Sequence, residues 1–225
     1  MSSPGGMVIL AVSKKTIARI LDTLEALYPY DGRCFLDYKE PWQLLFATIL
    51  SAQCTDDRVN QVTPVLFEKF PSLEAFACAE LSALEEVIHS TGFYRAKSRH
   101  LQNSARKLLS EYAGQLPSDI EALTGLSGVG RKTANVVRGH IFGIPSIVVD
   151  THVMRVTRHL GLTNEKDPVK IEFDLMKKLP KESWIRYNQQ IITHGRKVCT
   201  ARSPRCEECA LKNDCVKAKM KGMGK

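Results

Sequence analysis

Apolar residues return every three or four positions along most of this chain, the spacing that lets a helix bury one face. In the first such stretch Ser13 is suited to cap a helix, and the stripe behind it is formed by Ile17, Ile20, Leu21, Leu24 and Leu27. A second stretch begins at Pro41, a residue suited to a first helical turn, and runs from Trp42 to about Gln53. The pattern predicts a helix in each stretch.

The middle of the chain continues this periodicity. Helices are expected over Thr55–Phe70, around Leu81–Ile88 as far as Gly92, over Arg95–Tyr112, and, after a Ser118-Asp119-Ile120-Glu121 capping box, as far as Gly125. Pro64 should kink or break the first of these helices. The apolar side of the long third helix is formed by Leu101, Ala105, Leu108 and Leu109.

The remaining stretches also read as helices. One carries Lys132, and the others cover Asp150–His159, Val169–Leu179 and Ser183–Val198. No segment shows sustained period-two alternation, so the predicted fold class is all-α. The 225 residues suit one large or two small domains, and no apolar run is long enough to span a bilayer. We expect residues 2–6 to be disordered and the protein to be intracellular.

The positive charge of the chain is concentrated in two segments. Of a formal net charge of +8, residues 126–160 supply +4, with five Lys or Arg against one Asp, and residues 196–225 supply +6, with nine against three acidic residues. The remainder is therefore slightly acidic, at −2. Two basic segments on an acidic body indicate a surface that binds a polyanion. For Lys217–Lys225 the alternative is a solvated, lysine-rich tail.

Candidate chemistry lies in residues 126–135, Leu-Ser-Gly-Val-Gly-Arg-Lys-Thr-Ala-Asn. Gly128 and Gly130 allow a tight hairpin close to a ligand, and the N–H groups that open the next helix form an anion site. Lys132 stands in the first turn of that helix, where positive potential favours the neutral, nucleophilic amine. The segment departs from P-loop and dinucleotide patterns, since Arg131 precedes the lysine and Thr133 replaces a third glycine. The plainer alternative is an ordinary helical connection with an exposed lysine.

Four of the seven cysteines crowd the C-terminus in a C-x6-C-x2-C-x5-C pattern, at Cys199, Cys206, Cys209 and Cys215. The scattered Cys34, Cys54 and Cys78 are expected to be reduced core thiols. Four thiolates so close together favour a metal site over disulfides. Structural zinc usually takes two Cys-x-x-Cys-like pairs, and only one is present, so the spacing favours an iron–sulfur cluster, with zinc as the alternative.

Together these features resemble the endonuclease III family of DNA repair glycosylases. Four signatures follow in the family's order: Leu50-Ser51-Ala52-Gln53-Cys54-Thr55-Asp56, the helix–hairpin–helix at 126–137, Val149-Asp150-Thr151-His152-Val153, and the four-cysteine loop. The resemblance covers about Pro41 to Cys215. It implies two helical domains with a DNA-binding cleft between them. One would be a six-helix barrel over 34–144 with the helix–hairpin–helix, and the other a discontinuous domain of 1–33 and 145–225. The loop at 199–215 would bind a [4Fe–4S] cluster through its four cysteines.

The resemblance also implies a reaction, in which the damaged nucleotide is flipped out of double-stranded DNA. Lys132 would attack the sugar C1′, expel the base and form a Schiff base, so that β-elimination cuts the strand on the 3′ side. Asp150 would stabilise the cationic sugar and help to move protons. Gln53 would fill the gap left by the base, and Phe93 stands where an apolar wedge, often leucine in close relatives, is expected. The further expected DNA contacts are Gly128, Gly130 and Arg131.

Each of these residues has a plainer interpretation. Asp150 could be no more than a helix cap, Gln53 could be a surface residue, and Phe93 could be a packing residue. His152 is assigned no chemistry. Related adenine-mismatch glycosylases lack a lysine at position 132 and carry an additional C-terminal domain, for which we expect no residues here. This favours a bifunctional glycosylase and abasic-site lyase acting on oxidised pyrimidines.

Two alternative functions stay open. One is a mismatch or alkylated-base glycosylase, and the other is a non-catalytic helix–hairpin–helix DNA-binding protein with a four-cysteine metal loop. The expected partner is double-stranded DNA containing damaged bases or abasic sites, with no membrane. We expect a monomer in the cytoplasm of a prokaryotic cell, associated with the nucleoid.

Overall fold

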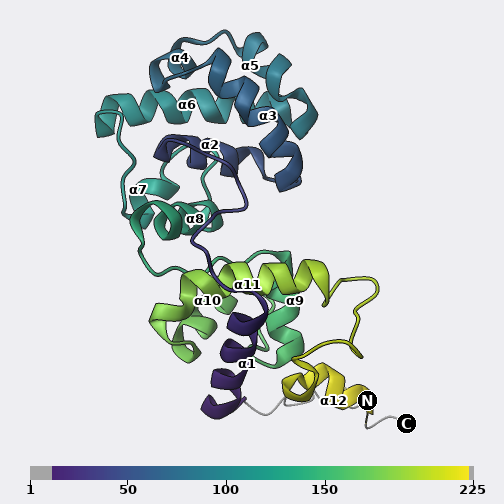
Figure 1. The fold of residues 1–225 in the computed structure, drawn as a ribbon. Helices are drawn as coiled ribbons and strands as arrows, with labels where there is room; N and C mark the ends of the chain where they lie inside the picture. Colours follow the sequence, from purple (N-terminus) through teal and green to yellow (C-terminus); the bar gives the residue numbers. More distant parts are fainter. Residues whose placement is uncertain (1–11, 223–225) are drawn as a thin grey trace, which may run out of the picture. The chain divides into compact units, whose positions relative to one another are not determined.

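The computed structural model describes residues 12–222, and every regular element in this range is a helix (Figure 1). The absence of strands from the described residues confirms the all-α prediction, and none of the described helices is long and apolar enough to cross a membrane. Residues 2–6 and the last three positions of the basic tail lie outside this range. The chain divides into two compact units, one of residues 33–146 and one that joins the described residues up to Gly32 with those from Ile147 onward.

The unit of residues 33–146 is built around one buried helix. Its elements are α2 (Pro41–Leu50), α3 (Asp56–Lys69), α4 (Leu73–Cys78), α5 (Leu81–Ile88), the 3-10 turn η1 (His89–Thr91), α6 (Tyr94–Tyr112), α7 (Ile120–Thr124) and α8 (Arg131–Phe142). Helix α2 packs against α3, α6 and α8, and α6 packs against α4 and α5 (Figure 1). Leu44, Leu45 and Phe46 are fully buried. Because neighbours cover α2 on several sides, its sequence is an almost continuous apolar run.

The second unit combines the two ends of the described chain. Its elements are α1 (Lys14–Leu27), α9 (Thr151–Leu160), α10 (Pro168–Lys178), η2 (Lys181–Ser183), α11 (Trp184–Lys197), η3 (Lys212–Asp214) and α12 (Val216–Gly222). Helix α11 packs against both α1 and α9. Gln190 of α11 donates a 2.7 Å hydrogen bond to Glu25, and Arg19 of α1 binds both carboxylate oxygens of Asp214, at 2.5 and 3.3 Å. These contacts join α1 to segments far away in the sequence.

Several predicted boundaries are wrong. Helix α3 continues through the exposed Pro64, so the helix is not broken there. The cap of α7 is Asp119 and not Ser118, because the Asp119 carboxylate accepts from the N–H groups of Glu121 and Ala122, both at 2.9 Å. Helix α2 ends at Leu50, so Gln53 stands in the turn after it. The short helices α4 and α12 were not predicted at all.

Candidate active site and metal centre

The glycine hairpin is fastened to helix α6 by three side chains. His100 Nδ1 lies 2.9 Å from Ser127 Oγ, and the Ser104 hydroxyl donates to the Ser127 carbonyl at 2.8 Å. Lys107 Nζ donates to the Gly125 carbonyl at 3.1 Å. These bonds fix the backbone that leads into α8, which is what a binding loop needs in order to present its N–H groups in one geometry.

Gly128 is required by two separate features of this hairpin. Its φ is +76°, a left-handed conformation that side chains rarely adopt, and a Cβ placed there would lie 2.7 Å from His100 Cγ. Gly130 has neither constraint, since its φ is −90° and a Cβ added there would have nothing within 4 Å. The two glycines therefore have different roles in the turn.

Gly128→Ala should lower the free energy of unfolding by about 2 kcal/mol or more, from backbone strain plus overpacking against His100. Gly130→Ala, the matched control, should cost less than about 1 kcal/mol, the size of a weakened N-cap. Chemical denaturation of the two variants measures the difference. Equal losses would show that the contact with His100 does not constrain the hairpin.

Lys132 is exposed and is the second residue of α8. Gly130 caps this helix without a side chain, while Ala134, Asn135 and Val137 turn the other side of α8 into the core. The N–H groups of the first turn are therefore not covered by a capping side chain. This arrangement leaves an amine beside a site that suits an anionic ligand.

Asp150 lies in the other unit, at the start of α9. Its carboxylate accepts a 2.7 Å hydrogen bond from the N–H of Val153, so the N-cap that sequence analysis considered does form. The residues just before it are buried, and the N–H of Val148 donates to Asn188 Oδ1 at 3.0 Å. The segment that carries Asp150 is thus held on both sides, and the half-buried carboxylate has a fixed position.

The basic residue Arg155 has an internal role. Its Nη2 donates to the carbonyls of Gly195 and Cys199, both at 2.9 Å, and lies 3.1 Å from His152 Nδ1. Both N–H groups of this guanidinium nitrogen are used by the two carbonyls, so the nearby His152 ring is a neighbour of Arg155 and not its main acceptor. Burial lowers the pKa of His152, against the opposing effect of Asp150. Arg155 therefore joins α9 to the start of the cysteine loop and is not a free DNA contact.

Gln53 and Phe93 both occupy turns and both have a left-handed backbone, with φ of 54° and 50°. Gln53 is exposed, and 67% of Phe93 is exposed, which is unusual for so large an apolar side chain. This exposure contradicts the plainer interpretation of Phe93 as a packing residue, while its role as a wedge stays a prediction. These two side chains project from the turns after α2 and before α6.

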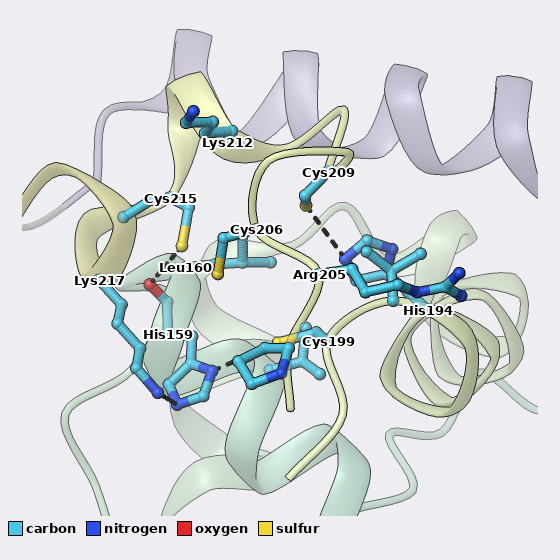
Figure 2. Close-up of a pocket in the computed structure, with 14 residues that line it drawn as sticks. His159, Leu160, His194, Cys199, Arg205, Cys206, Cys209, Lys212, Cys215 and Lys217 are labelled. Carbon is cyan, nitrogen blue, oxygen red and sulfur yellow. Dashed lines mark hydrogen bonds between the residues drawn. The ribbon is translucent and has the colours of Figure 1, made fainter. Parts of the chain in front are cut away.

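The four clustered cysteines line one cavity together with Val156 and Leu160 of α9 and with Val198, the residue that follows α11. Figure 2 shows their side chains arranged around this shared space. All are free thiols, and among the described residues no three possible ligands converge on a single-ion site. Burial raises the pKa of Cys199, Cys209 and Cys215, so metal ligation would have to offset the cost of forming thiolates. Four sulfur donors around one cavity fit a cluster of several atoms.

Two histidines contact these cysteines, and no pattern in the sequence indicated either of them (Figure 2). His159 Nε2 lies 2.8 Å from Lys217 Nζ, which can only donate, so His159 Nδ1 carries the proton and donates to Cys199 Sγ at 3.3 Å. His194 Nε2 lies 3.6 Å from Cys209 Sγ, and burial lowers the pKa of His194 to about 4. Lys217 is thus part of the wall of the site, which contradicts the alternative of a wholly solvated tail.

Comparison with known proteins gives consistent matches. Residues 46–181 match the model of the HhH-GPD superfamily of base excision DNA repair proteins, and residues 199–215 match the iron-sulfur binding domain of endonuclease III. The chain is 50% identical over 210 residues to a protein named endonuclease III from Synechocystis sp., covering 93% of this chain and 95% of that one. It is 37% identical over 180 residues to endonuclease III of Escherichia coli, covering 80% and 85%.

The fold likeness is equally extensive. The structure of a trapped endonuclease III–DNA covalent intermediate is 42% identical to this chain, with a TM-score of 0.88 over 94% of this chain and 99% of the other. A non-covalent endonuclease III–DNA complex, also 42% identical, gives a TM-score of 0.89 over 95% and 100%.

Proposed function

We propose, from the premise that this chain belongs to the endonuclease III family, that Lys132 and Asp150 carry its chemistry and that its four C-terminal cysteines hold its cluster. The protein is a bifunctional DNA glycosylase and abasic-site lyase of base excision repair with a [4Fe–4S] cluster. Its partner is DNA. What the family does not assign by itself is the role of each residue in this chain.

The observation that carries the assignment is the exposed amine at the second position of α8, behind a hairpin fixed by α6. The neutral amine of Lys132 attacks the sugar C1′, the bond from C1′ to the base breaks, and the base leaves with the bonding electrons and takes up a proton. Loss of the ring oxygen bond then gives a protonated Schiff base. Removal of a C2′ proton eliminates the 3′ phosphate and nicks the strand.

Asp150 acts through its charge in this proposal. Its carboxylate would stabilise the cationic sugar as the base leaves, and it would accept or return protons in the later steps. Its fixed position as the cap of α9 preorganises that charge. We further propose that oxidised pyrimidines are the damaged bases and that the protein acts as a monomer at the nucleoid of a bacterial cell, as its relatives are bacterial.

Borohydride reduction tests the proposal directly. Pure protein incubated with an abasic duplex and reductant should form a covalent adduct, and peptide mapping should place the DNA on Lys132. A helix–hairpin–helix protein that only binds DNA, with Lys132 as a phosphate contact, would give retarded complexes and no adduct.

The duplex affinity should fall steeply with salt, because the two basic segments replace counterions on the DNA. Arg131→Ala and Arg205→Ala should each lower the slope of log affinity against log salt by about one unit if the side chain touches a phosphate. Lys69→Ala is the control, since Lys69 is outside both segments and pairs with Glu86 at 3.5 Å. Unchanged slopes for both arginine variants would place the DNA on another surface.

The purified protein should be brown and contain about four irons per chain. Cys206→Ser or Cys209→Ser should bleach it and disorder the C-terminal part, because metal binding contributes to folding. Cys78→Ser should keep both colour and iron, since that cysteine is outside the loop. The Cys78 side chain is exposed, so the expectation that it is a core thiol is wrong. Stoichiometric zinc in anaerobically prepared protein would overturn the assignment of these cysteines to the cluster.

A further inference from the structure

Lys97 of α6 is buried in the unit of residues 33–146, with only 4% of its surface exposed. Lysine is almost never buried to this extent unless its ammonium group is paired with polar partners. Here the ammonium donates to two backbone carbonyls, those of Leu50 and Thr91, both at 2.8 Å. Burial lowers the pKa of this lysine, with the nearby Cys54 acting in the opposite direction.

The two carbonyls belong to the ends of two separate helical segments. Leu50 is the last residue of α2, and Thr91 is the last residue of η1. Carbonyls at helix ends lack partners within the helix, and a cation at this end also interacts favourably with the helix dipole. One ammonium group therefore satisfies both ends and ties them to the first turns of α6.

Each tied end leads directly into one of the two exposed turn residues. Gln53 follows Leu50 by three positions, and Phe93 follows Thr91 by two. Both have positive φ without being glycine, a conformation that costs on the order of 1–3 kcal/mol and persists only where the surroundings enforce it. The hydrogen bonds from Lys97 to the carbonyls of Leu50 and Thr91, just before the two turns, help to enforce this conformation.

We propose that Lys97 is a positioning residue that fixes Gln53 and Phe93 relative to each other, so that both side chains enter the duplex together when a base is extruded. The inference rests on the proposed roles of these two side chains in filling the stack. Lys97 touches no DNA in this proposal. It acts because a single buried donor holds both turns, which an apolar side chain of the same length cannot do.

Lys97→Met tests this, because methionine has a similar unbranched shape and no donor. The readout is the ratio of two single-turnover rates, base removal from damaged duplex and nicking of a pre-formed abasic duplex, where no base has to be extruded. Lys97→Met should lower this ratio about tenfold or more. Gln102→Met is the matched control, since Gln102 lies on the same helix, is buried, and donates to the Ala79 carbonyl at 2.7 Å. It should keep the wild-type ratio.

Gln53→Ala and Phe93→Ala, measured in parallel, test the roles of these two side chains separately from the role of Lys97. If neither lowers the ratio, their proposed roles in the duplex are wrong. If they lower it while Lys97→Met keeps the wild-type value, the positioning role of Lys97 is wrong, and an equal fall in Gln102→Met would overturn it as well.

Lys97→Gln covers the case in which the methionine variant does not fold. Its amide keeps two N–H donors on a stem one bond shorter, and we expect a ratio between those of wild type and Lys97→Met. A 2-aminopurine placed beside the lesion reports unstacking by its fluorescence. A folded Lys97→Gln protein with wild-type ratio and wild-type unstacking would refute the proposal.

Discussion

Lys132→Gln should abolish both borohydride trapping and strand nicking while leaving duplex binding nearly intact. Glutamine keeps a polar side chain at an exposed position, so the fold of α8 should not change. It has no amine that can form a Schiff base, and loss of a covalent nucleophile removes the pathway itself. The affinity should fall only by the contribution of one charge within range of a phosphate.

The measurement needs three readings on the same preparation. Gel analysis after reduction counts the adduct, a single-turnover assay on abasic duplex gives the nicking rate, and a titration without reductant gives the affinity. Lys69→Gln is a suitable control, because that lysine is exposed in the same unit, pairs with Glu86 at 3.5 Å and has no role in holding the hairpin. It should form the adduct normally. An adduct that survives Lys132→Gln in full would remove the central assignment.

Local signals allowed the sequence to predict most helices of this fold. Ser13 caps α1 and accepts from the N–H of Thr16, as the residue type and the following apolar stripe indicate. The fully buried Leu101, Ala105 and Leu108 were likewise predicted from their spacing on one face of α6. Helix α4 was not predicted, because its six residues make fewer than two turns and cannot show a helical periodicity of apolar residues.

The end of α2 could not be predicted from the same pattern. The apolar run predicts a helix to Gln53, whereas the chain leaves the helix after Leu50 and Gln53 adopts φ of 54°. The Leu50 carbonyl at this end accepts a hydrogen bond from the side chain of Lys97, 47 positions away. A lysine in a basic, amphipathic helix gives no sign of such burial.

The surroundings of the four cysteines likewise include contacts that local sequence patterns do not predict. Their spacing predicts a shared metal site, and they do line one cavity. The His159 contact with Cys199 joins residues 40 positions apart, and no local motif links a histidine at the end of α9 to that loop. Pairs of this kind depend on how helices pack and require the structure.

Asp150→Asn should slow base removal about a hundredfold or more while leaving the fold and the cap of α9 intact. Asparagine caps a helix about as well as aspartate, so the bond from the Val153 N–H, 2.7 Å in this structure, should be kept. What disappears is the negative charge beside the developing sugar cation. A hundredfold loss corresponds to about 2.7 kcal/mol of transition-state stabilisation, the size expected for one electrostatic group.

The same unit supplies a matched control for this change. Asp167 caps α10 in the same way, accepting from the N–H of Lys170 at 2.9 Å, and has no assigned role in the reaction. The free energies of unfolding of Asp167→Asn and Asp150→Asn, measured by denaturant titration, should therefore both lie within about 0.5 kcal/mol of wild type. Only Asp150→Asn should lose glycosylase activity in single-turnover assays. Wild-type activity in both variants would reduce Asp150 to a helix cap, because capping is the one property that the two aspartates share.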